Sequence, residues 1–232
     1  RIGSSGGADT PSSEPTRNPQ AKKTHQELID EAEAKGIERV TVEKLDHPLS
    51  ESEIIEKLQG GDMTRGSCAS LALAYTANKA QMDVTDYRGG ESCEMFATND
   101  NLLSIAEFDG VKSTTVKDTN DIKASVELLK TAEPGREYIL VTGKHAAIVR
   151  RKPTKGFEYL DLQNPDAGEN GFKPLTSDAL KTRFGCKKSH SVAGYKLEAT
   201  IALIDCESLG ESKEFGDLMQ YVNTHPSEQQ KG

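Results

Sequence analysis

The chain has 232 residues, of which 34% are hydrophobic, and its 29 basic and 37 acidic residues give a formal net charge of −8. This acidic balance argues against an extended phosphate-binding surface, so we expect no nucleic-acid partner and a monomer kept apart by its own charge. No apolar run approaches the roughly 20 residues of a membrane span, which argues against a membrane partner. The N-terminus lacks the apolar core of a signal peptide, which argues against a signal-directed route. The cysteines form no C-x-x-C pair, which argues against a zinc site, and we expect no other metal.

The first 23 residues are predicted to form a disordered leader, or the linker from a larger protein, because Gly, Ser, Pro and Thr dominate them. Such a composition cannot bury enough apolar surface to offset the entropy of ordering. Residues 24–232 are predicted to form one folded domain, since no linker interrupts them.

Three helices are predicted in the first part of this domain. The first begins at Thr24, which forms a capping box with Glu27, and ends at Gly36. A strand is predicted over 40–45, and a second capped helix begins at Ser50. The third, over 64–81, has small and apolar residues on all sides, which indicates a helix buried on most of its surface.

Helices are also predicted over 99–108, 118–130, 175–183 and 214–223, and strands over 136–143, 145–151, 157–163 and 195–205, with a turn over 152–156. This order favours an α+β fold in which a helical first half packs on an antiparallel sheet. A basic cluster runs through the second half, and we interpret it as a solvated face: Arg150, Arg151, Lys152, Lys155, Lys181, Arg183, Lys187 and Lys188.

Cys68 lies at the start of the third helix, in the sequence Gly66-Ser67-Cys68-Ala69. A helix N-terminus lowers the pKa of a thiol and directs free backbone N–H groups at a developing oxyanion. We therefore expect a thiolate nucleophile at Cys68, with Ser67 and Ala69 as candidate oxyanion groups. A buried cysteine with no chemical role is the alternative.

His145 begins an apolar strand, and Asp161 lies in the next strand on a polar face that also carries Tyr159 and Gln163. A turn near residue 153 or 154 brings His145 opposite Asp161 or Gln163, within the roughly 5 Å that separates cross-strand neighbours. The sequence thus predicts a Cys68–His145–Asp161 triad, with Gln163 as a candidate substrate contact.

The G-S-C helix start, the G-K-H-A-A-I-V strand and the Y-L-D-L-Q strand resemble the papain-like fold toxins of bacterial polymorphic toxin and effector systems, which include glutamine deamidases. The resemblance covers residues 64–175. It implies a papain-like fold, a hydrolase acting on protein substrates without a cofactor, delivery into the cytoplasm of a target cell, and an immunity protein as a partner. Deamidation, proteolysis and acyl transfer stay open.

This chain departs from the family pattern at Lys144, which separates Gly143 from His145, and at Leu162, where a proline is common. The second oxyanion donor is unassigned. Two other functions remain as alternatives. One is an ADP-ribosyltransferase-type toxin that uses Arg88, although the acidic pair Glu31 and Glu33 precedes that arginine. The other is a non-enzymatic binding or phage-structural module.

Overall fold

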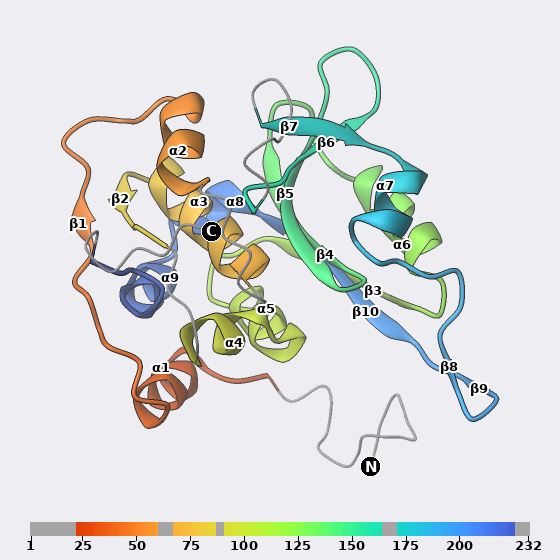
Figure 1. Cartoon of the computed structure of the whole chain (residues 1–232), viewed down its shortest axis with the longest axis horizontal. Helices are drawn as coiled ribbons and strands as arrows, with labels where there is room; N and C mark the ends of the chain where they lie inside the picture. Colours follow the sequence, from red (N-terminus) through yellow and green to blue (C-terminus); the bar gives the residue numbers. More distant parts are fainter. Residues whose placement is uncertain (1–21, 60–66, 87–90, 164–170, 226–232) are drawn as a thin grey trace.

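The computed structural model describes residues 22–59, 67–86, 91–163 and 171–225. Within them, one six-stranded sheet carries helices on both of its faces (Figure 1). Every neighbouring pair of its strands is antiparallel. The expected α+β class with an antiparallel sheet is therefore confirmed. In spatial order the strands are β3 (Ser113–Asp118), β10 (Ala199–Asp205), β4 (Glu137–Thr142), β5 (His145–Arg151), β6 (Phe157–Leu160) and β7 (Phe172–Leu175).

Nine α-helices are found in the described residues. Five come from the first half of the chain: α1 (His25–Ala34), α2 (Glu51–Leu58), α3 (Ser67–Lys79), α4 (Glu91–Ala97) and α5 (Asn99–Ile105). The others are α6 (Asp121–Leu129), α7 (Ser177–Thr182), α8 (Cys206–Gly210) and α9 (Lys213–Leu218), which the 3₁₀ turn η1 (Met219–Tyr221) extends. Two small ribbons complete the fold: β1 (Glu43–Lys44) with β2 (Met82–Asp83), and β8 (Ser191–Val192) with β9 (Tyr195–Lys196).

The helix starts follow the capping signals in the sequence. The Thr24 side chain accepts the Glu27 backbone N–H, and the Glu27 carboxylate accepts the Thr24 N–H. The same reciprocal pair joins Ser50 and Glu53 at the start of α2. Each box satisfies backbone donors that a helix N-terminus otherwise leaves unpaired.

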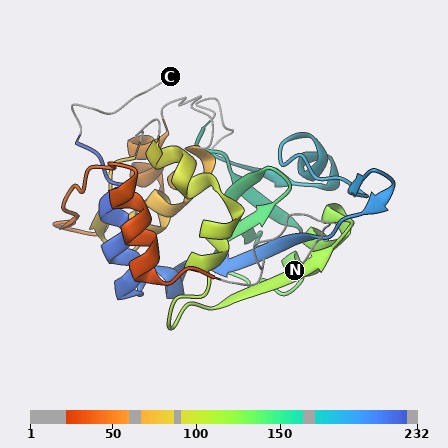
Figure 2. The same cartoon turned by 90° about the horizontal axis from the view of Figure 1, so that it is seen from below.

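Alternating side chains of the sheet build two separate cores. Ala146, Ile148 and Leu160 face α3 and the other helices of the first half. Ala147, Val149 and Tyr159 face α6 and α7 on the opposite side. Figure 1 shows α6 and α7 on one side of the strands and α3 on the other, and Figure 2 shows α1 and α9 side by side in the larger helical layer.

Helix α3 lies at the centre of the larger core, which explains its apolar character all round. Its residues from Ala69 to Asn78 are all buried. Because α3 is enclosed by α2, α4, α8 and β5, few of its side chains meet water. The prediction of a buried helix over 64–81 is confirmed for the described residues.

Several predicted elements differ from the structure. The strand expected over 40–45 shrinks to β1, and the one expected over 195–205 divides into β9 and β10. Helices α4 and α8 and strands β2, β3, β7 and β8 were missed. Strand β3 is an edge strand of partly buried and exposed residues, so it lacks the apolar alternation that marks a strand. The region predicted as a leader falls, through residue 21, outside the described residues. No described helix combines the length and apolar character needed to span a bilayer.

Candidate active site

Cys68 is the second residue of α3, and its side chain is partly buried where this helix starts against β5. The backbone amides of Ala69 and Ala146 lie against the sulfur and favour its thiolate form. Ala69 belongs to the first turn of the helix, and Ala146 to the strand that begins at His145. The sulfur therefore meets amides from two elements, as an oxyanion formed beside it would.

Burial raises the pKa of the Cys68 thiol, although the two amides and the Arg183 guanidinium act in the opposite direction. The expected lowering of this pKa is therefore wrong. Desolvation penalises the charged sulfur more than the start of the helix stabilises it. In the state that the structure describes, Cys68 is a neutral thiol at pH 7.

His145 opens β5 opposite Thr142 of β4. Its place in the alternation puts it on the same face as Ala147, and its ring packs edge-to-face on Phe184 with 5.0 Å between the centroids. The side chain is buried, and its Nε2 has no hydrogen-bond partner among the described residues. Burial, together with the nearby Arg183, lowers the pKa of His145 to about 4, so the imidazole is neutral at pH 7.

Asp161 directly follows the last residue of β6, at the point where this strand leaves the ladder. The pairing of Ile148 with Leu160, continued along both chains, would place position 163 opposite His145 and Asp161 two residues away on the same face. The ladder itself ends at Ile148 and Leu160, and Leu162 and Gln163 form a turn, so neither of the two expected cross-strand pairs with His145 forms.

The Asp161 carboxylate is held by Arg183, the C-cap residue of α7. Arg183 Nε donates to Asp161 Oδ2 over 2.5 Å, and Nη2 donates to Oδ1 over 2.8 Å and to the Gln163 Oε1 over 3.1 Å. The Asp161 side chain is only 1% exposed, and the guanidinium holds its pKa below the usual range despite the burial. No hydrogen bond or ion pair of the described residues joins Asp161 to His145.

All three members of the expected triad line one small cavity between α3 and the split between β5 and β6. Its volume is about 10 Å³, which is at most enough for one water molecule. The sequence therefore predicted three residues that share a cavity, but not that this cavity is closed. The same cavity is lined by Gln163, whereas the side chain of Ser67 lies outside the described part of the chain.

Arg183 is the site residue that the sequence analysis missed, because it was assigned to a solvated basic face. That interpretation is wrong for Arg183 and also for Arg150, whose guanidinium contacts Glu51, Glu137 and Glu158 and stacks on Phe172. A signal existed: Asp161 stands between Leu160 and Leu162, a buried carboxylate requires a cation nearby, and an arginine is the side chain that pairs with both of its oxygens.

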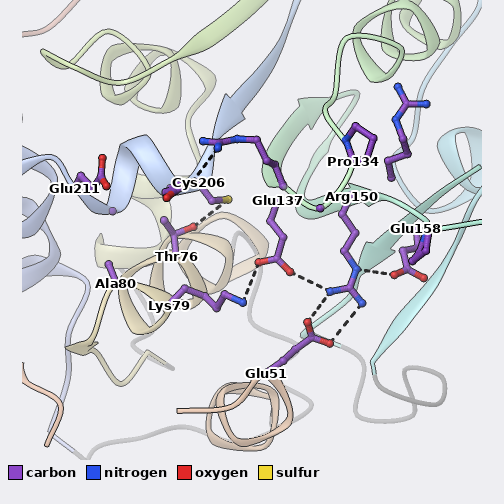
Figure 3. Close-up of a pocket in the computed structure, with 16 residues that line it drawn as sticks. Glu51, Thr76, Lys79, Ala80, Pro134, Glu137, Arg150, Glu158, Cys206 and Glu211 are labelled. Carbon is purple, nitrogen blue, oxygen red and sulfur yellow. Dashed lines mark hydrogen bonds and ion pairs between the residues drawn. The ribbon is translucent and has the colours of Figure 1, made fainter. Parts of the chain in front are cut away.

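A second and larger cavity, of about 1020 Å³, lies at the opposite end of α3. It is bordered by Lys79 in the last turn of α3, by the start of β4 and by α8 (Figure 3). Along the helix, Lys79 is roughly 16 Å from Cys68. Its charged groups largely pair with one another, as Arg150 does with Glu137 and Glu51. This groove is therefore separate from the Cys68 cavity.

Of the residues of the ADP-ribosyltransferase alternative, the structure describes only the two acids. Arg88 lies outside the described residues. Glu31 binds Lys23 and Asn101, and Glu33 accepts a hydrogen bond from the Tyr221 hydroxyl. Both acids thus serve contacts within the helical layer. The described residues contain no group of three or more His, Cys, Asp or Glu side chains arranged to hold a metal ion.

Comparison of the chain with protein-family models, with curated proteins and with solved structures finds no match.

Proposed function

We propose that the chain is a cysteine-dependent amide hydrolase acting on protein substrates, with Cys68 as nucleophile, His145 as general acid and base, and Asp161 as the group that orients the imidazole. One observation carries the proposal: these three residues, separated by 77 and 16 positions in the chain, line a single cavity at the start of a buried helix. The papain-like fold that the sequence resemblance implies is part of the same proposal.

In the proposed reaction, the imidazole of His145 takes the proton of the Cys68 thiol while the sulfur attacks the carbonyl carbon of a carboxamide. The oxyanion forms beside the Ala69 and Ala146 amides, the groups that already lie against the sulfur. His145 then gives the proton to the leaving nitrogen, so that a thioester and ammonia or an amine result. Water, deprotonated by the same imidazole, hydrolyses the thioester and restores the thiol.

The imidazole of His145 is unprotonated at pH 7, as a base must be before the attack, but its pKa of about 4 makes it a weak base for the Cys68 thiol in the state that the structure describes. Two backbone amides from different elements supply the oxyanion contacts, which removes the need for the side-chain donor that the sequence leaves unassigned. We further propose that the enzyme is a bacterial toxin or effector that deamidates glutamine, a preference that rests on the family resemblance alone.

The proposal is tested by intact-mass spectrometry of candidate target proteins after incubation with the chain. Deamidation adds about one dalton per converted side chain, whereas proteolysis yields fragments. The variant Cys68→Ala is expected to abolish either product, and Cys206→Ala, which removes a buried thiol outside the site, is the matched control. Undiminished activity or toxicity of Cys68→Ala would refute the proposal and favour a binding module.

A further inference from the structure

The two residues that follow α7 contact two different members of the proposed triad. Arg183 binds the Asp161 carboxylate through two nitrogen atoms, and the adjacent Phe184 packs its ring edge-to-face with the His145 imidazole. A single short stretch of backbone therefore controls the surroundings of both the base and the group proposed to orient it.

This stretch is fixed to the turn that precedes His145. The Lys144 N–H donates to the Phe184 carbonyl over 2.7 Å. Gly143 has a φ of +60°, and a Cβ at this position would lie 2.3 Å from the same carbonyl oxygen. Glycine is required here for both reasons, since other residues rarely adopt this φ and any side chain would collide with the backbone. The contact of Phe184 with His145 is thus set by backbone packing.

With both carboxylate oxygens engaged by Arg183, Asp161 makes no bond to the imidazole, and the buried His145 Nε2 has no partner in the part of the chain that the structure describes. A buried nitrogen without a hydrogen bond is costly and usually has an explanation in function. The cavity beside it is too small for a carboxamide substrate. These three observations describe a resting site in which the triad residues are adjacent but unconnected.

We infer that Arg183 is a positioning residue that holds Asp161 away from His145, so that the competent site forms when Asp161 exchanges Arg183 for the imidazole. This inference rests on the proposed function. When Arg183 withdraws, Asp161 loses its counterion in a buried position, and His145 is the neighbouring group that can accept a proton and replace it. Among the described residues, the other titratable groups that act on this pair are the Cys68 thiol, the Tyr159 hydroxyl and Lys173.

The test compares rates of Cys68 alkylation by iodoacetamide at pH 7.5 in four proteins: the unmodified chain, Arg183→Gln, Arg183→Gln combined with Asp161→Asn, and Arg151→Gln. Arg151 is the matched control, since its guanidinium binds the backbone carbonyls of Ala132 and Lys130 and lies over the Phe157 ring, away from the proposed triad. We expect Arg183→Gln to raise the rate at least about tenfold, the double variant to lose most of that gain, and the Arg151→Gln control to leave the rate within about twofold of the unmodified chain.

If Arg183 had only a structural or electrostatic role, Arg183→Gln would lower the alkylation rate of Cys68 instead of raising it. The Arg183 charge favours the Cys68 thiolate, so its removal alone would slow alkylation. An unchanged or slower rate in Arg183→Gln overturns the inference, as does an equal gain in the double variant, which lacks the carboxylate. Arg183→Lys provides a second variant if Arg183→Gln fails to fold: it keeps the charge but not the two-pronged contact, and a rise of at least about threefold is expected. No rise in Arg183→Lys likewise overturns it.

The pH titration of His145 supplies a readout that does not depend on the alkylation rates. We expect the NMR titration of the His145 ring in Arg183→Gln to move to higher pH than in the unmodified chain, since the repelling charge is lost and the Asp161 charge is gained as a partner. A shift to lower pH, or none, overturns the exchange. If His145→Gln slows alkylation of Cys68 in the unmodified chain while Arg183→Gln leaves it unchanged, the inference fails and the proposed function stands. If neither His145→Gln nor Arg183→Gln changes the alkylation rate of Cys68, the proposed function fails as well.

Discussion

The substitution Gly143→Ala tests the packing that sets the position of Phe184 against His145. Its Cβ would lie 2.3 Å from the Phe184 carbonyl oxygen and 3.0 Å from the Cys186 nitrogen, and both are backbone atoms that cannot rotate away. The left-handed backbone costs an L-residue about 1–2 kcal/mol. Displacing a packed segment adds about 1–3 kcal/mol. We therefore expect a loss of about 2–5 kcal/mol in the free energy of unfolding.

The control is Gly156→Ala in the turn at the other end of β5. Gly156 also has a positive φ, of +89°, but a Cβ there meets nothing within 4 Å. It should cost only the backbone term, about 1–2 kcal/mol. Urea unfolding monitored by circular dichroism measures both losses. In thermal unfolding, each kcal/mol corresponds to a fall of roughly 2–4 °C in Tm for a chain of this size. Equal losses in the two variants would refute the close contact between the two segments.

Two further predictions concern charge. The pKa of His145 is about 4 in the folded chain, against an ordinary value of 6.5. Between pH 6.5 and 4, the unfolded chain therefore binds a proton that the folded chain does not. Acidification over this range should lower the free energy of unfolding by roughly 3 kcal/mol. Urea midpoints at several pH values should show this loss and a smaller one in His145→Gln; identical pH dependence would contradict the lowered pKa. Arg150→Met should lose about 2–3 kcal/mol, because three glutamates are left without their shared cation. Lys152→Met is the control, and a similar loss in both would contradict the charge network.

Helices α1 and α2 were predictable from local capping signals, and α3 from its run of small and apolar residues. Thr24 and Ser50 carry their capping partners three residues later, so α1 and α2 could be located with little ambiguity. Helix α4 and edge strand β3 lack such signals. The long strand expected over 195–205 is interrupted because residues 195–196 pair back on β8 and leave the main sheet.

That Cys68, His145 and Asp161 line one cavity was predictable in part, because the short hairpin between β5 and β6 brings Asp161 back toward His145. The electrostatics of the site were not predictable from the sequence. The helix N-terminus favoured a lowered pKa at Cys68, but the degree of burial, which raises it, depends on packing across the whole fold. Arg183 comes from α7, which packs on the sheet face opposite α3, and no local pattern links it to Asp161.

The dependence of Cys68 reactivity on His145 tests the central claim most directly. Native protein is treated with iodoacetamide at pH 7.5, and the alkylation rate of each of the four free thiols is followed by peptide mass spectrometry, with and without His145→Gln. Exposure alone favours Cys68 over the three buried thiols, so the comparison between the two proteins decides the matter. A single catalytic centre predicts that His145→Gln slows Cys68 at least about tenfold and leaves Cys93, Cys186 and Cys206 unchanged. An unaltered Cys68 rate would contradict it.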